Sequence, residues 1–95
     1  MLAGNIAYGT LKAIKVYDFS NVKITKLYFH SNATHQDEAS CNGVARITHS
    51  LHGASTERMI SIALSGYIAN RKVRAYSENA GSCEADFLSI SDTHL

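Results

Sequence analysis

Alternating hydrophobic and polar residues predict a first β-strand near the start of the chain. Within Thr10–Asp18, Ile14 and Val16 fall on one face, whereas Lys15 and Tyr17 fall on the other. A period of two residues is typical of a strand with one buried face.

A second strand is predicted at Val22–His30, where the pattern changes partway along. The hydrophobic positions Val22 and Ile24 shift phase to Leu27 and Phe29. Since one extra residue turns every following side chain to the opposite face, this shift predicts a β-bulge. Bulges bend strands, as barrels require.

Three shorter strands are predicted farther along the chain, bounded by polar segments. They are expected at Val44–His49, Lys72–Ser77 and Ala85–Ser91. The polar residues 31–43 and 78–82 between strands have the composition of loops.

One helix is predicted, at Ser55–Ala69. Its hydrophobic residues fall at i, i+3, i+4, i+7 and i+8 in one continuous stripe, formed by Ile60, Ala63, Leu64, Tyr67 and Ile68. Met59 and Ile62 widen the hydrophobic arc beyond what packing on one small sheet needs. Gly66 weakens the helix unless another element packs close to it.

The resulting order, β-β-β-α-β-β, describes a single, mainly β domain over residues 1–95. It is the element order of the OB-fold, a five-stranded, partly open barrel with a helix between its third and fourth strands. We therefore expect an OB-fold.

A domain of 95 residues buries only about 60–65% of the surface that its unfolded chain exposes. Further stabilisation is expected from a disulfide, from oligomerisation or from both. A bond between the two cysteines, Cys41 and Cys83, would contribute about 4 kcal/mol in the chain-entropy model and would indicate an oxidising compartment. Two unpaired thiols in a cytosolic protein are the alternative.

The net charge of +1 indicates no acidic partner, but the charge is unevenly distributed. Residues 1–29 contain four lysines and one aspartate, namely Lys12, Lys15, Lys23, Lys26 and Asp18. Residues 30–95 carry a net charge of −2. A basic face near the first two strands and an ordinary solvated β-surface both explain this asymmetry.

No residue pattern predicts catalysis, so the chain is not expected to be an enzyme. It has no GxSxG-like nucleophile turn, and the adjacent carboxylates Asp37 and Glu38 lie in a polar loop. His49 and His52 lack the i, i+4 spacing of metal ligands on a helix. We expect no metal site and no cofactor.

Binding of single-stranded nucleic acid is one alternative function, because OB barrels often carry aromatic platforms and basic grooves. Tyr28, Phe29, Lys26 and Arg46 are the candidate residues. Adjacent residues of a strand point to opposite faces, so only one of the two aromatic side chains can be a platform. Nucleic acid is therefore the less favoured partner.

Membrane insertion is not expected, because no hydrophobic run approaches the roughly 18 residues that a membrane helix needs. Met1–Gly4 is too short to be a signal peptide. If the cysteines pair, we expect a soluble chain that is secreted or periplasmic, with its leader absent from this sequence.

Several short motifs follow one another between Cys41 and Ser91. They are Gly53-Ala54-Ser55 at the start of the helix, Tyr67 near its end, Lys72-Val73-Arg74-Ala75-Tyr76, Cys83 and Phe87-Leu88-Ser89-Ile90. In order and spacing they resemble the B subunits of bacterial AB5 toxins, especially the pertussis-like and subtilase cytotoxin group. The resemblance covers about half of the chain.

This resemblance implies an OB-fold protomer in a homopentameric ring that recognises host cell-surface glycans in a lectin-like way, without a cofactor. Whether a catalytic A subunit joins the ring stays open. An orphan structural oligomer without a ligand is the other alternative. A helix that is hydrophobic beyond one face agrees with a subunit interface, for which we expect Met59, Ile62 and Ser65.

The resemblance also implies a glycan site near two strand ends. The family uses a serine just before the first strand and a tyrosine at the end of the fourth, where this chain has Tyr8 and Ser77. A tyrosine could stack on a sugar and a serine could donate a hydrogen bond. We therefore expect glycan contacts from Tyr8, Thr10, Ser77 and Glu78.

Overall fold

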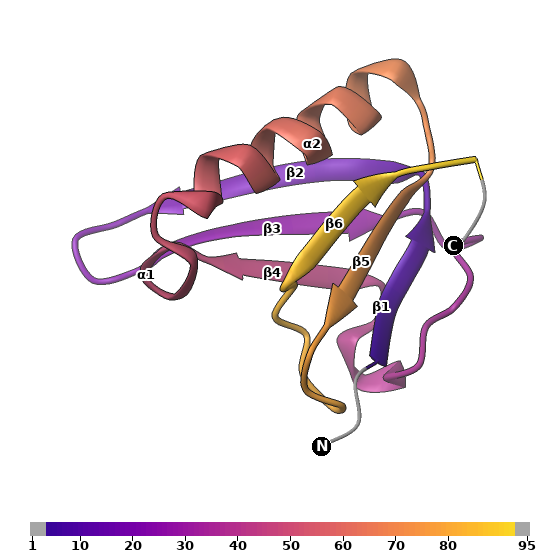
Figure 1. The fold of residues 1–95 in the computed structure, drawn as a ribbon, viewed down its shortest axis with the longest axis horizontal. Coiled ribbons are helices and arrows are strands. Elements are labelled where there is room, and N and C mark those ends of the chain that lie inside the picture. The colour runs from indigo at the N-terminus through magenta and orange to yellow at the C-terminus, as the bar shows by residue number, and fades with distance from the viewer. Residues whose placement is uncertain (1–3, 93–95) are drawn as a thin grey trace.

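The computed structural model describes residues 4–92, in which six strands form two antiparallel three-stranded sheets (Figure 1). The first sheet has the order β1-β5-β6, with β1 at Gly4–Gly9, β5 at Val73–Ser77 and β6 at Phe87–Ile90. The second sheet has the order β2-β3-β4, with β2 at Leu11–Asp18, β3 at Lys23–Phe29 and β4 at Val44–Thr48.

The helical segments all lie in connections between strands. A 3-10 turn at Ala39–Cys41 follows β3, and the short helix α1 at His49–His52 follows β4. The main helix, α2, spans Ser55–Ala69 and has the bounds that its hydrophobic pattern predicts. It packs against β6 of the first sheet and β2 of the second.

The predicted five-stranded OB barrel is wrong, although the mainly β character of the chain is confirmed. An additional strand, β1, pairs with β5, and β6 pairs with the other side of β5. These three strands form a sheet of their own, so the described residues make two sheets and no closed barrel. The residues from Ile6 to Gly9 are all buried, and this removes the period-two signal that would have predicted β1.

Each sheet is joined by backbone hydrogen bonds to a loop that leads from or to a strand of the other sheet. Tyr8 and Thr34 each donate an amide hydrogen to the other's carbonyl oxygen, with both N–O distances 2.8 Å. In a second contact of this kind, the amide of Arg46 donates to the carbonyl of Cys83, and the amide of Ala85 donates to the carbonyl of Arg46, both at 2.8 Å. We call this second contact, together with the side chains of Arg46, Thr48, His52 and Glu84, the junction.

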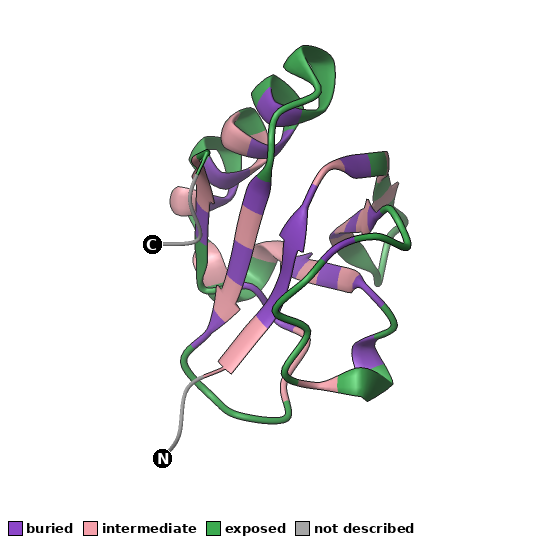
Figure 2. Cartoon of the chain, turned by 90° about the vertical axis from the view of Figure 1, so that its right-hand side faces the viewer, coloured by how far each residue is buried: buried purple, intermediate pink, exposed green. Residues whose placement is uncertain are grey.

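The core lies between the inner faces of the sheets and under α2 (Figure 2). Its largest fully buried hydrophobic side chains are Ile6, Leu27, Ile47 and Val73. Both sheets contribute to this set, so the two sheets and the helix share one core.

The face of α2 that packs on the core differs from the predicted one. The buried residues are Thr56, Met59, Ala63 and Gly66, whereas Leu64, Tyr67 and Ile68 are exposed. A Cβ atom on Gly66 would lie 2.5 Å from Cγ2 of Val73, so this position brings the helix unusually close to the sheet. Small side chains on one face allow that close approach, and the larger hydrophobic side chains are turned away.

The predicted bulge in the second strand is also wrong. β3 pairs with β4 in unbroken register, and its residues Thr25, Leu27 and Phe29 are all buried. Ile24 therefore lies on the outer face. The irregularity is instead in β2, between Leu11 and Ala13. A buried threonine in the inward series explains why the hydrophobic pattern suggested a change of phase.

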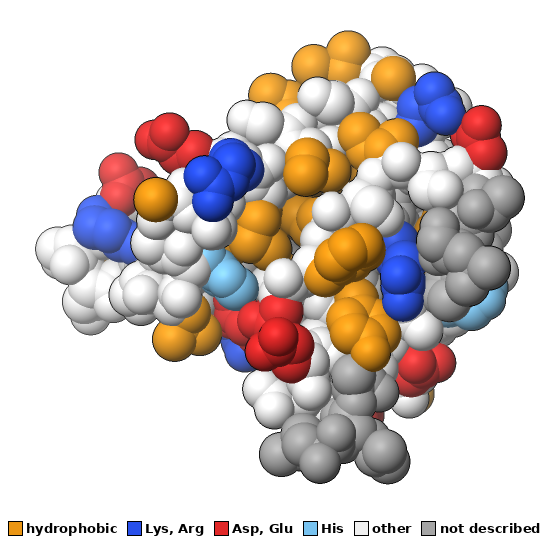
Figure 3. Space-filling view, in the orientation of Figure 1, with side chains coloured by type: hydrophobic (Ala, Val, Ile, Leu, Met, Phe, Trp, Pro, Cys, Tyr) orange, Lys and Arg blue, Asp and Glu red, His pale blue; other side chains and the backbone are white. Residues whose placement is uncertain are grey.

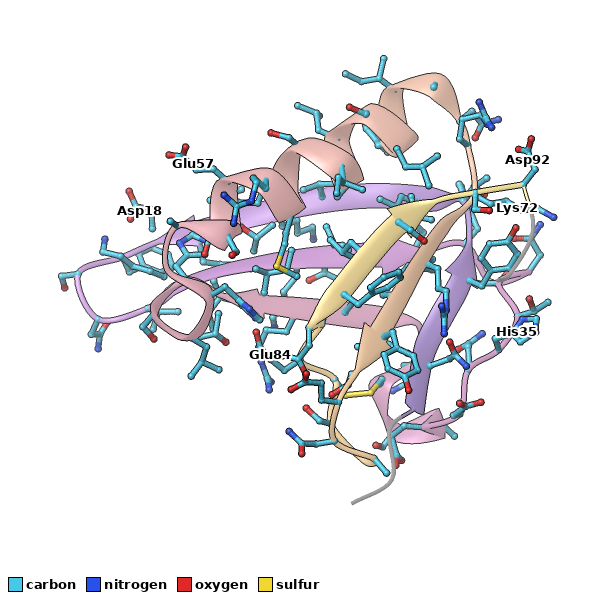
Figure 4. The ribbon with its side chains drawn as sticks, in the orientation of Figure 1. Asp18, His35, Glu57, Lys72, Glu84 and Asp92 are labelled. Atoms are coloured by element: carbon cyan, nitrogen blue, oxygen red, sulfur yellow. A yellow bond between two sulfur atoms is a disulfide. The ribbon has the colours of Figure 1, made fainter. Side chains whose placement is uncertain are left out.

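The predicted disulfide is confirmed. Cys41 and Cys83 are bonded, with their Cα atoms 5.6 Å apart and a sequence separation of 42 residues (Figure 4). It links the 3-10 turn after β3 to the loop before β6. A disulfide of this kind is compatible with the cell exterior or the periplasm, where such bonds persist. Within residues 4–92, none of the helices is long and apolar enough to cross a membrane.

Candidate ligand-binding face

The outer face of the first sheet gathers aromatic and basic side chains. The strand register places Asn5 opposite Tyr76 and Tyr76 opposite Phe87. Arg74 is two residues from Tyr76 on the same strand, so its side chain points to the same side. We call these four residues, Asn5, Arg74, Tyr76 and Phe87, the aromatic face. Figure 3 shows hydrophobic side chains beside a basic one over β5 and β6.

The guanidinium of Arg74 contacts both aromatic rings of this face. Its central carbon lies 4.8 Å from the ring centroid of Tyr76 and 5.3 Å from that of Phe87. The two rings meet edge to face, with centroids 6.4 Å apart and planes at 81°. Cation–π contacts and perpendicular rings are both favourable arrangements, so the three side chains hold one another in place.

The guanidinium of Arg74 also has N–H donors that are not used in hydrogen bonds within this face. Among the described residues, the guanidinium makes one side-chain hydrogen bond, from Nε of Arg74 to Oδ1 of Asn5 at 3.0 Å. An arginine carries five N–H donors, so the terminal nitrogens can still donate to a ligand. Phe87 is 44% exposed and supplies an accessible ring. The arrangement can therefore combine stacking with donation to an oxygen-rich ligand.

The four predicted glycan contacts do not form one site. In the β1–β5 pair, Gly4 lies opposite Ser77 and Gly9 lies opposite Val73. Tyr8 and Thr10 are therefore at one end of the sheet, and Ser77 and Glu78 are at the other. The prediction placed Tyr8 just before the first strand and Ser77 at the end of the fourth. In the structure Tyr8 instead lies within β1, whose antiparallel pairing with β5 puts Tyr8 and Ser77 at opposite ends of the sheet.

Two of these four side chains are also buried. Tyr8 is 6% exposed, and its hydroxyl donates to the carbonyl of Ser91 at 2.9 Å. Ser77 is 1% exposed, and its hydroxyl donates to Oδ2 of Asp86 at 3.4 Å. Both side chains are part of the packing of the first sheet, and neither presents a surface to a sugar.

Thr10 and Glu78 lie nearer the solvent. Oγ1 of Thr10 is 3.0 Å from Nδ1 of His30, and Glu78 is exposed and donates its amide hydrogen to Asp86. Of the four predicted contacts, these two remain accessible.

Sequence reasoning missed Arg74, Tyr76 and Phe87 as a group. The alternation Arg74-Ala75-Tyr76 places two of them on one face of a predicted strand. Phe87, however, becomes their neighbour only through the register of β6 against β5. The first part of the signal was present in the sequence, and the second required the structure.

The junction contains a buried carboxylate with several donors. Glu84, 9% exposed at its side chain, accepts hydrogen bonds from Nε of Arg46 at 2.9 Å and from Nε2 of His52 at 2.8 Å (Figure 4). It also accepts from the amide and the hydroxyl of Thr48, both at 2.6 Å. Burial acts to raise the pKa of Glu84, but these hydrogen bonds outweigh it and lower the pKa below its ordinary value.

The predicted subunit interface is divided between the core and the surface. Met59 is only 8% exposed and belongs to the core, so its side chain is not on the outer surface. Ile62 is half-buried against the core, and Ser65 is exposed. The exposed hydrophobic residues of the helix are instead Leu64, Tyr67 and Ile68, which we call the helix patch.

Two hollows lie elsewhere on the surface, and the smaller one borders the aromatic face at Asn5. The larger, of about 530 Å³, lies between the β2–β3 turn and α1, and the smaller, of about 160 Å³, lies beside the start of β1. His49 lines the larger hollow, where its Nε2 lies 2.9 Å from Oγ1 of Thr25. Across the part of the chain that the structure describes, no group of three or more His, Cys, Asp or Glu side chains is placed to hold a metal ion.

Comparisons with protein-family models, with curated proteins and with solved structures give no match to this chain.

Proposed function

We propose that the chain is a glycan-binding, receptor-recognition subunit of a secreted, toxin-like assembly, and that it acts as a homopentameric ring by binding and not by catalysis. The aromatic face carries this proposal. Aromatic rings bind the apolar faces of sugars, while arginine donates to hydroxyl or carboxylate oxygens. Arg74, Tyr76 and Phe87 supply both kinds of contact within a few ångströms of one another.

Self-association is supported by the helix patch. Ile68 is 74% exposed, and Leu64 and Tyr67 are each more than two-fifths exposed, in a domain with a modest core. Exposed hydrophobic side chains that adjoin one another often mark contacts between proteins. The number of five subunits comes from the resemblance to toxin B subunits, which supports the proposal through the order of its motifs and not through the fold.

The glycan proposal is tested by screening the oxidised protein on a glycan array and measuring the affinity of each hit in solution. Phe87→Ala is expected to weaken binding by about tenfold, because it removes an exposed stacking ring. Phe19→Ala is the matched control, since Phe19 is 62% exposed but lies in the β2–β3 turn. Equal losses in both variants would contradict a site on the aromatic face.

Association is tested by native mass spectrometry. We expect a fivefold mass for the wild-type protein and a monomer for Ile68→Glu, because a charge in the helix patch opposes its burial between subunits. Leu51→Glu, at a similarly exposed position on α1, should leave the mass unchanged. A ring that binds no glycan would indicate the orphan structural oligomer, and a wild-type monomer would overturn the ring.

A further inference from the structure

The outer face of the second sheet carries a row of three basic residues. Lys15 pairs with Lys26 across β2 and β3, and Lys26 pairs with Arg46 across β3 and β4. Paired residues lie on the same face of a sheet, and neighbouring strands are about 4.8 Å apart. The row therefore crosses the whole sheet over about 10 Å.

Two tyrosines extend this row into a continuous surface. Tyr17 and Tyr28 are on the same face, with their hydroxyl oxygens 3.5 Å apart. Nζ of Lys15 lies 4.9 Å from the ring centroid of Tyr28, and Nζ of Lys26 lies 5.5 Å from that of Tyr17. We call Lys15, Tyr17, Lys26, Tyr28 and Arg46 the basic face.

The charges of the two lysines are not compensated by neighbouring acids. In residues 4–92, the ion pairs involve Lys23, Arg46, His52 and Arg71, but neither Lys15 nor Lys26. Like charges directly opposite each other in a sheet are destabilising. Lys15 and Lys26 therefore repel each other in the isolated chain, and this repulsion is reduced when a chain of negative charges lies along the row.

We infer that the basic face binds a sulfated polysaccharide of the glycosaminoglycan type, at a site separate from the aromatic face. Such a polymer carries anionic groups at intervals along its length. One polymer chain can therefore contact several cations of the row at once. The Cys41–Cys83 disulfide is compatible with a compartment outside the cytosol, where sulfated polysaccharides occur.

The same geometry disfavours single-stranded nucleic acid. Proteins that bind it stack bases on aromatic rings. On the basic face, each tyrosine ring already has a lysine ammonium over it, as the distances above show. Contacts with sulfate groups need only the ammonium groups and leave these cation–π pairs intact.

The inference is tested by binding of the oxidised, full-length protein to heparin at salt concentrations from about 50 to 200 mM, the range over which counterion release changes affinity strongly. The double variant Lys15→Gln/Lys26→Gln should weaken binding by about 25-fold, or about fivefold per lysine. Its salt dependence should be less steep by roughly 1.5 units of log–log slope.

The control variant Arg58→Gln/Lys72→Gln removes the same charge elsewhere. Arg58 lies on α2 and donates to Ser55, and Lys72 precedes β5 of the first sheet and lies over the ring of Tyr8, so neither residue belongs to β2, β3 or β4. It should bind heparin within about twofold of the wild-type protein, since exposed charges at distance are screened. Equal losses in the two double variants would overturn the inference in favour of general charge attraction.

Two further ligands separate the remaining outcomes. Desulfated heparin should bind at least tenfold more weakly, and equal binding would overturn the role of sulfate. A single-stranded oligonucleotide that binds more tightly than heparin, and loses affinity in Lys15→Gln/Lys26→Gln, would assign the face to nucleic acid. Phe87→Ala should leave heparin binding unchanged, so this test is independent of the proposed glycan site.

Discussion

At the junction between the sheets, a carboxylate is buried and surrounded by donors, whereas on the aromatic face a guanidinium is placed on the surface with few partners. Glu84 accepts four hydrogen bonds from three residues. Arg74 makes one side-chain hydrogen bond within residues 4–92 and lies against two rings. The two charged side chains thus have opposite surroundings in the same small domain.

The difference in surroundings indicates different roles for the two side chains. Glu84 stabilises the fold, whereas Arg74 has donors that a ligand can use. A buried charge that loses its partners costs several kcal/mol, so Glu84 and its donors depend on one another. A cation over exposed rings contributes only about 0.5–1 kcal/mol to stability. Changes at the junction should therefore act on the free energy of unfolding, and changes on the aromatic face should act on binding.

The largest expected effect is the loss of the disulfide beside the junction. Cys41→Ala/Cys83→Ala should lower the free energy of unfolding by about 4 kcal/mol, because the bond closes a long loop in the unfolded chain. Urea unfolding followed by circular dichroism measures this change. Reduction of the wild-type protein should shift the urea midpoint to a similar extent, and an unchanged midpoint in both cases would show that the junction holds without the bond.

Glu84→Gln should have the next largest effect, lowering the free energy of unfolding by about 2–3 kcal/mol. The amide keeps the shape of the side chain, but it removes the charge that Arg46 and His52 contact. Glu57→Gln is the matched control, because Glu57 lies exposed in the first turn of α2 (Figure 4). That change should cost less than about 1 kcal/mol, from the helix dipole alone.

The pH dependence of stability provides a finer test of the junction. The folded-state pKa of Glu84 is lowered from its ordinary value of 4.5, so its ionised form contributes stability above about pH 4.5. This contribution is lost as the pH falls through the folded-state pKa. Urea midpoints measured between neutral and acidic pH should converge for the wild-type protein and Glu84→Gln, and a constant difference would argue against an ionised Glu84 in the fold.

The junction also shows what sequence reasoning could not find. The strands β2 to β6 and the helix were predicted from local patterns of hydrophobic and polar residues, which indicate the type of an element and its approximate bounds. No hydrophobic or polar pattern around Glu84 marks it as a residue of a site. Its partners Arg46 and His52 lie more than 30 residues away and meet it through a parallel contact between β4 and the loop before β6. Such a contact leaves no local pattern.

The orientation of α2 was missed for a different physical reason. The pattern favoured the face with the largest hydrophobic side chains, but helix packing at Gly66 depends on how closely the backbone approaches Val73. A helix face with small residues can pack more closely against the sheet than a face with large ones. A hydrophobicity pattern does not measure how closely two elements pack. The same limit applies to the aromatic face, where Arg74 and Tyr76 were recognisable as neighbours and Phe87 was not.

The smallest expected change in stability is that of Arg74→Gln, which tests the aromatic face. It removes the contacts with Tyr76 and Phe87 but leaves the inner face of β5 unchanged, so the free energy of unfolding should fall by less than about 1 kcal/mol. Glycan affinity should nevertheless fall by about tenfold or more, because the terminal donors are lost. Arg71→Gln is the control, since Arg71 pairs with the exposed Asp92 and lies outside the aromatic face. If Arg74→Gln instead destabilises the protein as strongly as Glu84→Gln, the guanidinium holds the sheet together and the division between the two regions fails.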